Sequence, residues 1–307
     1  MQPSIRAAPN AFEWPTLALG ALIYAGWIAV TLLHRLIPPV LLPLLGGWLI
    51  AWQGSLQHET IHGHPTRWPA LNRLIGFAPL SLWLPYEAYR RSHLAHHATD
   101  RLTDPSTDPE SRYLVQGRGI AAALSAMQST LLGRLLVGPL LEVGRFIFTE
   151  ARALTRGDWG RWRIWGVHLF AVGAVLAWLK LVCRLSLGDY VLFFVYPGIA
   201  LSLLRSFAEH RADEEPARRV AVVEGAPLLG LLFLNNNLHA THHAHPAAPW
   251  WRLPGLYAVQ RPQLIADGAP VYTGYSEVFA RFLLRDHDRL QHPQHGALVA
   301  TARAATG

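Results

Sequence analysis

Histidines recur at regular spacings in three short stretches of this sequence. The stretches read HETIH, HLAHH and HATHH, and they contain the following eight histidines: His58, His62, His93, His96, His97, His239, His242 and His243. Residues three and four apart lie on one face of a helix, so we expect each stretch to aim two or three imidazoles at one point. Imidazole is a common metal ligand, and eight imidazoles exceed what one ion binds. The pattern therefore predicts a site for two metal ions.

Several other side chains are candidates to support such a site. Imidazole suits zinc, copper, iron and nickel, so residue type alone does not name the metal. Nearby acids could orient the histidine rings, and these are Glu59, Asp100, Asp104, Asp108 and Glu209. For Asp104 and Asp108 a place in a solvated polar loop is an equal expectation. His64 and His245, which trail their stretches, are open between a supporting role and the surface. The isolated histidines are interpreted as ordinary polar groups: His34, His168, His287, His292 and His295.

The composition indicates a membrane protein. The chain is 51% hydrophobic and only 15% charged, against roughly 25% charged in ordinary soluble domains. Four apolar runs are candidate transmembrane helices, since about 20 residues span a bilayer core. They cover residues 14–33, 40–57, 164–182 and 190–204. The expected fold is therefore an all-α integral membrane protein with about four transmembrane helices, interfacial helices and a cytoplasmic histidine-rich cap.

The remaining segments are expected to lie at the membrane surface. The run at 74–85 is too short to cross and contains prolines, which indicates a re-entrant or interfacial element. Residues 98–163 are polar and then amphipathic, and residues 220–238 are expected to form an interfacial helix that leads into HATHH. Residues 1–285 would form one membrane-embedded domain, followed by a weakly ordered tail over 286–307.

Charge sets the expected orientation. With four spans, only Arg35, Lys180 and Arg184 fall at the two turns on one side, and the other basic residues lie on the opposite side. The positive-inside rule then places both termini and all histidine stretches in the cytoplasm, in a multi-pass protein of the inner membrane. The N-terminus lacks the features of a cleaved signal peptide. Basic residues are spread singly or in pairs, which argues against a nucleic-acid partner.

The three histidine stretches, on about four spans and facing the cytoplasm, resemble the membrane fatty acid desaturase/hydroxylase superfamily. The resemblance runs from about residue 50 to 285, and NNNLHATHHAHPAAPWWRLP and VYTGYSEVFARFLLR are similar to bacterial members of that superfamily. It implies a non-haem di-iron centre that uses dioxygen as co-substrate and abstracts hydrogen from an unactivated C–H bond.

The resemblance also assigns ligands. It implies that the eight histidines of the three stretches bind iron, and that a further histidine between the second and third stretches completes the set. His210, in RSFAEHR after the fourth span, is the matching residue. Asn236 or Asn237 is expected to hold a metal-bound water or to cap a helix, with equal weight.

The expected partners follow from the same chemistry. The substrate would be a lipid or acyl chain that enters an apolar channel from the bilayer. Dioxygen chemistry needs electrons, yet the chain has one cysteine, Cys183, no GxGxxG motif and no cytochrome b5-like signature. A separate donor of the ferredoxin, rubredoxin or flavodoxin type is therefore expected. An acidic donor would suit the arginine-rich surface, although contact with lipid head groups explains those arginines slightly better.

Two other functions remain open. Desaturation and hydroxylation begin with the same hydrogen abstraction, so the first alternative is a hydroxylase or ketolase acting on an alkane, a sterol-like lipid or a carotenoid. The second is a membrane protein that binds or transports metal without catalysis. That function would need polar groups along the spans, and His168 is almost the only ionisable residue there.

Overall fold

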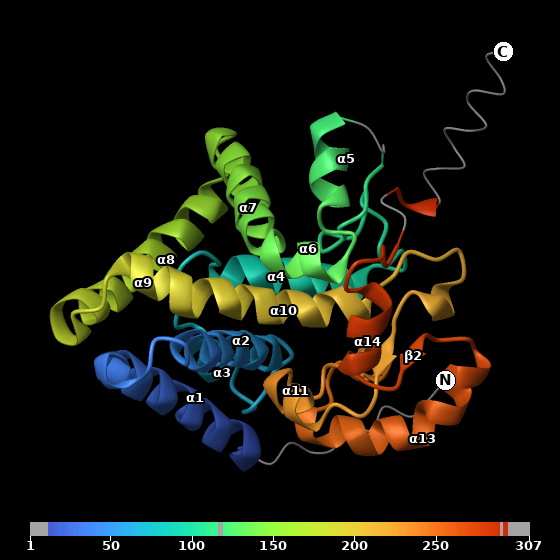
Figure 1. Ribbon diagram of the computed structural model, residues 1–307, viewed down its shortest axis with the longest axis horizontal. Coiled ribbons are helices and arrows are strands. Elements are labelled where there is room, and N and C mark those ends of the chain that lie inside the picture. Colours follow the sequence, from blue (N-terminus) through green and yellow to red (C-terminus); the bar gives the residue numbers. More distant parts are fainter. Residues whose placement is uncertain (1–11, 116–118, 289–290, 294–307) are drawn as a thin grey trace.

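The computed structural model describes residues 12–115, 119–288 and 291–293, and this part of the chain is mostly helical (Figure 1). The helices are α1 Trp14–Leu33, α2 Leu42–Ile61, α3 Pro69–Gly76, α4 Tyr86–Ala98, α5 Gly119–Ala126, α6 Leu131–Leu136, α7 Gly138–Thr155, α8 Trp159–Ala177, α9 Leu187–Tyr190, α10 Tyr196–Glu209, α11 Pro227–Leu232, α12 His239–Ala244, α13 Leu253–Ala266 and α14 Tyr275–Phe282. The described strands, β1 (Val222–Val223) and β2 (Val271–Tyr272), pair in parallel.

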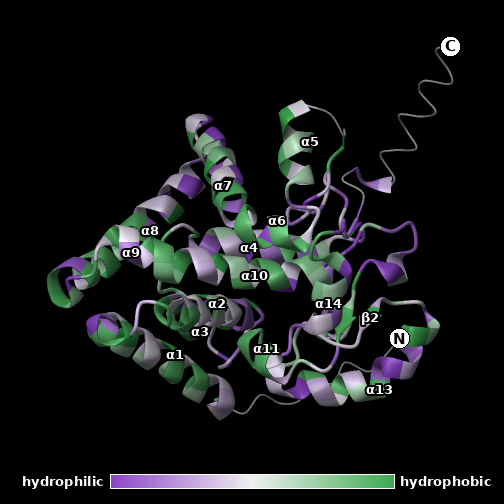
Figure 2. Ribbon diagram, in the orientation of Figure 1, coloured by the Kyte–Doolittle hydropathy of each residue, from purple (hydrophilic) through white to green (hydrophobic). Residues whose placement is uncertain are grey.

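Three helical segments of the described residues are long and apolar enough to cross a membrane. They are Trp14–Leu36, Trp159–Cys183 and Leu187–Glu209. Large apolar side chains are exposed along them, for example Phe170 and Leu181, which are 84% and 75% exposed. The apolar colouring of α1, α8 and α9 is visible in Figure 2. These three segments indicate a membrane protein, and three of the four predicted spans overlap them.

The remaining predicted span, 40–57, corresponds to α2, which is not among the three segments. Fifteen of its twenty residues are buried, and it packs against α1, α3 and α10 at the centre of the molecule (Figure 1). Its second half is polar and contains Gln53, Gln57, His58 and Glu59. The first half of α2 is thus apolar, and the second half carries the polar residues, including the predicted ligand His58. That α2 crosses a bilayer stays a prediction.

Polar side chains of α2 and of two later helical segments hold the end of α3 and the irregular segment 77–85 that follows it. Gln57 Nε2 donates to Gly76 O at 2.9 Å, and Gln53 Nε2 donates to Ala78 O at 2.8 Å. Further along, Leu80 O accepts from Tyr190 Oη at 2.6 Å, and Leu82 O lies 2.9 Å from His168 Nε2. Non-helical backbone beside a bilayer needs such partners, because water cannot supply them there. These bonds agree with the non-crossing element predicted at 74–85.

Glycines allow α2 and α10 to approach closely. A Cβ added at Gly198 of α10 would lie 2.5 Å from Ile50 Cβ of α2, and one at Gly47 of α2 would lie 2.8 Å from Pro197 Cβ of α10. Real Cβ atoms do not approach so closely, so only glycine fits at these positions. Because α2 and α10 each lead into histidines at their C-terminal ends, this contact fixes the relative position of His58, His62 and His210.

The prediction of one interfacial helix over 220–238 is wrong. The segment forms β1, the six-residue helix α11 and then a turn. Gly225, Leu234 and Asn235 all have positive φ angles, which a right-handed helix does not contain. The compact turn carries Asn236 and Asn237 inward, where both are buried.

Most of the predicted weakly ordered tail lies outside the described residues. Of its described residues, His287 packs on Phe207 with ring centroids 4.8 Å apart, and His292 is buried. His295 lies outside the described part of the chain.

Candidate metal centre

Four helix ends supply the nine predicted ligands. His58 is a buried residue in the last turn of α2, and His62 is the C-cap residue of that helix. α4, which begins directly after Pro85, supplies His93, His96 and His97. His210 follows α10 in an extended conformation, and α12 supplies His239, His242 and His243. All nine residues are thus brought to one region by elements that are far apart in the sequence.

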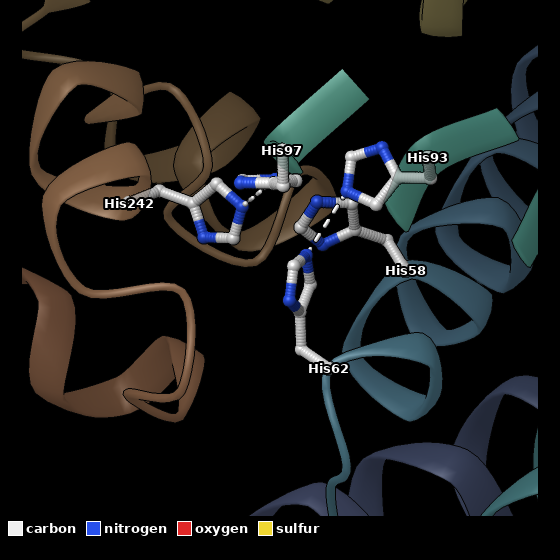
Figure 3. A group of neighbouring side chains, drawn as sticks. All are labelled: His58, His62, His93, His97 and His242. Atoms are coloured by element: carbon white, nitrogen blue, oxygen red, sulfur yellow. Dashed lines mark hydrogen bonds between the residues drawn. The ribbon is translucent and has the colours of Figure 1, made fainter. Parts of the chain in front are cut away.

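The nine histidines form two groups. The five-histidine group contains His58, His62, His93, His97 and His242, and the four-histidine group contains His96, His210, His239 and His243. Within each group, one nitrogen from every residue lies within 4.8 Å of the others. Figure 3 shows the rings of the five-histidine group converging from α2, α4 and α12.

The grouping corrects the expectation that each stretch aims at one point. In HLAHH, His93 and His97 join the five-histidine group while His96 joins the other group. In HATHH, His239 and His243 share the four-histidine group while His242 joins the other. Residues four apart share a helix face, whereas neighbouring residues point about 100° apart. One HxxHH stretch therefore contributes to both histidine groups.

Pairs of ring nitrogens face each other across each group. His62 Nε2 is 3.0 Å from His93 Nε2, and His242 Nε2 is 3.1 Å from His97 Nε2. In the other group, His239 Nε2 is 2.9 Å from His210 Nε2 and 3.1 Å from His243 Nε2. Two imidazole nitrogens bound to one ion at about 2.1 Å and at a right angle would lie about 3 Å apart. The spacing fits ligation of an ion within each group.

The electrostatics of the rings also favour a metal. Burial, and then the mutual repulsion of the rings, lower the pKa of His239, His242 and His243 well below the ordinary range. Neutral imidazoles keep a lone pair free for a cation. Several neutral rings that turn lone pairs toward one another are stabilised by a cation between them. The described residues thus fit metal ions at both groups.

Acidic and amide side chains hold the outer nitrogens of several rings. Asp108 Oδ1 lies 2.8 Å from His96 Nδ1, and Glu110 Oε1 lies 3.2 Å from His93 Nδ1. Asn236 Oδ1 lies 2.9 Å from His239 Nδ1, with Glu209 Oε1 at 3.4 Å. A carboxylate or carbonyl at the outer nitrogen fixes the ring and directs the other nitrogen at the metal.

The other three acids predicted to orient the rings have different surroundings. Glu59 Oε2 accepts the backbone N–H of Trp250, Asp104 Oδ1 accepts the N–H of Ser106 within its own loop, and Asp100 is exposed. Glu110 was not among the predicted acids. Only its position in the loop after HLAHH, two residues beyond Asp108, could have suggested it.

The two histidines left open by the sequence lie outside both groups. His64 Nδ1 is 2.7 Å from Glu13 Oε1, which ties the end of α2 to the start of α1. His245 Nε2 is 2.7 Å from Gln260 Nε2 of α13. Both residues thus contact neighbouring elements and belong to neither group. Asn237 donates to Val223 O at 2.7 Å, while the Asn236 Nδ2 atom lies 3.3 Å from His58 Nε2.

A cavity of about 1320 Å³ lies beside the histidines. His93, His96, His210 and His239 form part of its wall. Its apolar wall comes mainly from α7, α10 and the segment before α4, with one residue from α8, and includes Trp83, Leu84, Leu141, Ile164, Ile199 and Leu203. The volume exceeds the upper end of ordinary small-molecule pockets, which is roughly 1,000 Å³. A long apolar molecule would fit beside both histidine groups.

These features define a membrane protein with two adjacent histidine groups at an apolar cavity. The chain belongs to the fatty acid desaturase family, whose model matches residues 33–275. It is also similar to two curated proteins named beta-carotene ketolase from two strains of Paracoccus sp. One is 26% identical over 222 residues, which cover 67% of this chain and 74% of the relative. The other is 27% identical over 248 residues, which cover 74% and 82%.

Family membership identifies the protein as an oxidoreductase of the desaturase, hydroxylase and ketolase superfamily. The matching family is named for desaturation, whereas the two relatives are named for ketolation. Membership of the family therefore leaves the type of reaction open.

Proposed function

We propose that this protein is a membrane-bound di-iron oxidase that uses dioxygen to desaturate the hydrocarbon chain of a fatty acyl lipid or a related substrate. The observation that carries the proposal is that residues from both histidine groups and a long apolar wall line the same cavity. A bound hydrocarbon would therefore lie directly beside both candidate metal sites.

The proposed ligands divide between two ions. One iron would be held by His58, His62, His93, His97 and His242, and the other by His96, His210, His239 and His243. When bound, the iron pair would supply the oxidising power, through dioxygen, to remove hydrogen from an unactivated C–H bond.

The chain's own residues do the positioning. Asp108 and Glu110 hold His96 and His93 by their outer nitrogens, so the rings keep one orientation during turnover. The apolar wall, with Ile199 and Leu203 of α10, replaces water with the substrate chain. Excluding water protects the oxidant from side reactions and leaves the substrate's C–H bonds as its targets.

Ketolation or hydroxylation is the second candidate, and it is favoured by the likeness to two beta-carotene ketolases. Both reactions start with the same hydrogen removal as desaturation. They differ in whether a second hydrogen is lost or an oxygen atom is transferred to the carbon.

The electrons are proposed to come from a separate ferredoxin, rubredoxin or flavodoxin-type protein. Cys183 is the sole cysteine of the sequence and is buried among apolar residues. Exposed arginines on α7 and α8, including Arg152, Arg156 and Arg163, would attract an acidic donor. The same arginines suit anionic lipid head groups, and both roles require them to face the cytoplasm.

We further propose that the protein lies in the inner membrane with both termini and the histidines on the cytoplasmic side. Reporter fusions at each terminus test this orientation. A terminal alkaline phosphatase that is active, or a terminal fluorescent protein that stays dark, would contradict it.

The decisive experiment compares the lipids of cells that express the wild type or His242→Ala under labelled dioxygen. A new double bond without label, absent in the variant, would support desaturation. A labelled hydroxyl or keto group would establish the second candidate instead. His245→Ala is the matched control, because His245 lies two residues after His243 and belongs to neither group. This variant is expected to retain the product.

Metal analysis of protein purified in mild detergent tests the ions directly. The proposal expects about two irons per chain. A single zinc that survives the His242→Ala change would contradict it, and so would identical lipids in the wild-type and variant cells.

A further inference from the structure

An arginine cluster forms the wall of the cavity next to α5, α6 and α7. It consists of Arg112, Arg134 and Arg145 with the single acid Glu142, and all four residues line the cavity. Arg112 Nη1 donates to Glu142 Oε2, and Arg145 Nη2 lies 3.5 Å from Glu142 Oε1. One carboxylate thus serves two guanidinium groups, and the cluster has an excess of positive charge.

Arg134 is the member with no carboxylate within ion-pair distance among the described residues, although Glu142 favours its charge from further away. Its Nε donates to Gln128 O at 3.3 Å, and its guanidinium lies 5.7 Å from the centre of the Phe207 ring. Its Nη1 is shielded from solvent and has no hydrogen-bond partner in the part of the chain that the structure describes. An enclosed guanidinium nitrogen with no acceptor loses its water without compensation.

The other acidic side chains of the cavity wall already have hydrogen-bond or ion-pair partners. Asp108 and Glu110 contact histidines of the two groups. Glu150 pairs with Arg161, and Glu209 lies 3.0 Å from Arg205. Asp288 accepts from the Tyr113 hydroxyl. Rotation of one of these carboxylates toward Arg134 would break an existing contact, so the missing acceptor is expected to come from a ligand.

The rest of the wall gives the shape of that ligand. Apolar side chains from α7, α8 and α10 line the cavity, among them Leu141, Ile164 and Ile199, and the histidines lie along the same cavity. A molecule that fits both the apolar wall and the arginine cluster has a long apolar body and one anionic end. A substrate that is hydrocarbon throughout would leave Arg134 unpaired.

We propose that Arg134 binds the anionic end group of the substrate and that this substrate is an amphiphile with a single oxyanion, either the carboxylate of a free acid or the phosphodiester of a membrane lipid. Arginine binds such oxyanions through charge-assisted hydrogen bonds. Arg112 and Arg145 add to the local potential, while Glu142 holds them in place. This inference rests on the proposed function, because it names the class of molecule oxidised at the histidines.

The test measures binding, which needs neither turnover nor electrons. Radiolabelled palmitate is bound to purified protein in a non-ionic detergent at alkaline pH, where the acid is ionised, and methyl palmitate, hexadecanol and phosphatidylglycerol compete. The expected wild-type preference for palmitate over its methyl ester is roughly tenfold or more, the effect of one hydrogen bond to a charged group. Arg134→Gln is expected to remove that preference, and Arg134→Lys to keep part of it.

The control is Arg156→Gln at the exposed C-terminal end of α7, which does not line the cavity and should bind like the wild type. Metal content and elution volume of Arg134→Gln show whether that variant is folded. If Arg134→Gln does not fold, the Arg134→Lys variant and the preference of the wild type for the acid over its ester still test whether Arg134 binds an oxyanion.

Stronger displacement by phosphatidylglycerol than by unlabelled palmitate would identify the oxyanion as a phosphodiester from the membrane, and the reverse would identify a free acid. Equal binding of acid and ester by the wild type, no binding of any of the four ligands, or an unchanged preference in folded Arg134→Gln would overturn the proposal. An acid preference without any oxidised lipid in cells would instead defeat the proposed function alone.

Discussion

Asp108 and His96 form an enclosed pair beside the four-histidine group, with Oδ1 and Nδ1 2.8 Å apart and both side chains only 2% exposed. The carboxylate holds the outer nitrogen, and the Nε2 of His96 lies 3.4 Å from that of His243. The orientation of this proposed ligand thus depends on a residue twelve positions further along the chain.

We expect Asp108→Asn to weaken metal binding at the four-histidine group by roughly 10- to 100-fold, because the amide holds His96 less firmly and cannot balance charge. Chelator titration of purified protein, followed by metal analysis, measures the effect. Asp100→Asn, at an exposed position in the same region, should bind metal as the wild type does. Equal retention by both variants would show that Asp108 only stabilises its loop.

His243→Ala tests the division of the ligands. It removes one of four donors from one group and none from the other, so bound metal should fall from about two ions to about one per chain, since affinity depends on the complete ligand set. His245→Ala should leave two ions, because His245 contacts Gln260 instead. Loss of both ions from His243→Ala, in protein that is still folded, would mean that the five-histidine group cannot hold an ion while the four-histidine group is incomplete.

Gly198→Ala is expected to lower the thermal stability in detergent. The added Cβ would lie 2.5 Å from Ile50 Cβ, so α2 and α10 must move apart. Overpacking of this kind costs roughly 1–3 kcal/mol. Gly173→Ala on α8, where an added Cβ meets nothing within 4 Å, should instead be neutral or slightly stabilising. Differential scanning of both variants compares them, and a stable Gly198→Ala protein would contradict the close approach.

Glu142 gives a prediction of pH dependence. Burial alone would raise its pKa, but Arg112 and Arg145 outweigh burial and lower the pKa to about 2. A depressed carboxyl pKa stabilises the fold above the ordinary value, and the contribution disappears as the pH falls through the folded-state value. Glu142→Gln should therefore lower the melting temperature by a few degrees at neutral pH. Its difference from the wild type should shrink between about pH 4.5 and pH 2; a constant difference would contradict the ion pairing.

The histidines of the candidate site could be predicted because their spacing is local. His58 and His62, like His93 and His97, are four residues apart, and a helix turns such residues to one side. The division of HLAHH and HATHH between two groups could not be predicted so directly, because it depends on how α4 and α12 face each other. Glu110 was missed for the same reason, since its contact with His93 exists only when the loop after α4 folds back.

The predicted spans show a similar limit. Hydropathy identified α1, α8 and the α9 to α10 segment, because each contains a long apolar window with few charged residues. It also treated 220–238 as helical, although Gly225 and a turn with Leu234 and Asn235 at positive φ interrupt that segment. An apolar run indicates that a segment leaves water, but it does not tell whether the backbone there is a helix, a strand or a turn.

The shared use of α4 and α12 by both histidine groups has a consequence for assembly. Each helix contributes histidines to both groups, so neither group can be complete until α12 has docked against α4. An ion captured at one centre would fix both helices and thereby preassemble most of the other. In the wild type the second ion should therefore bind more tightly than the first, whereas His243→Ala would still hold one ion at its complete five-histidine group.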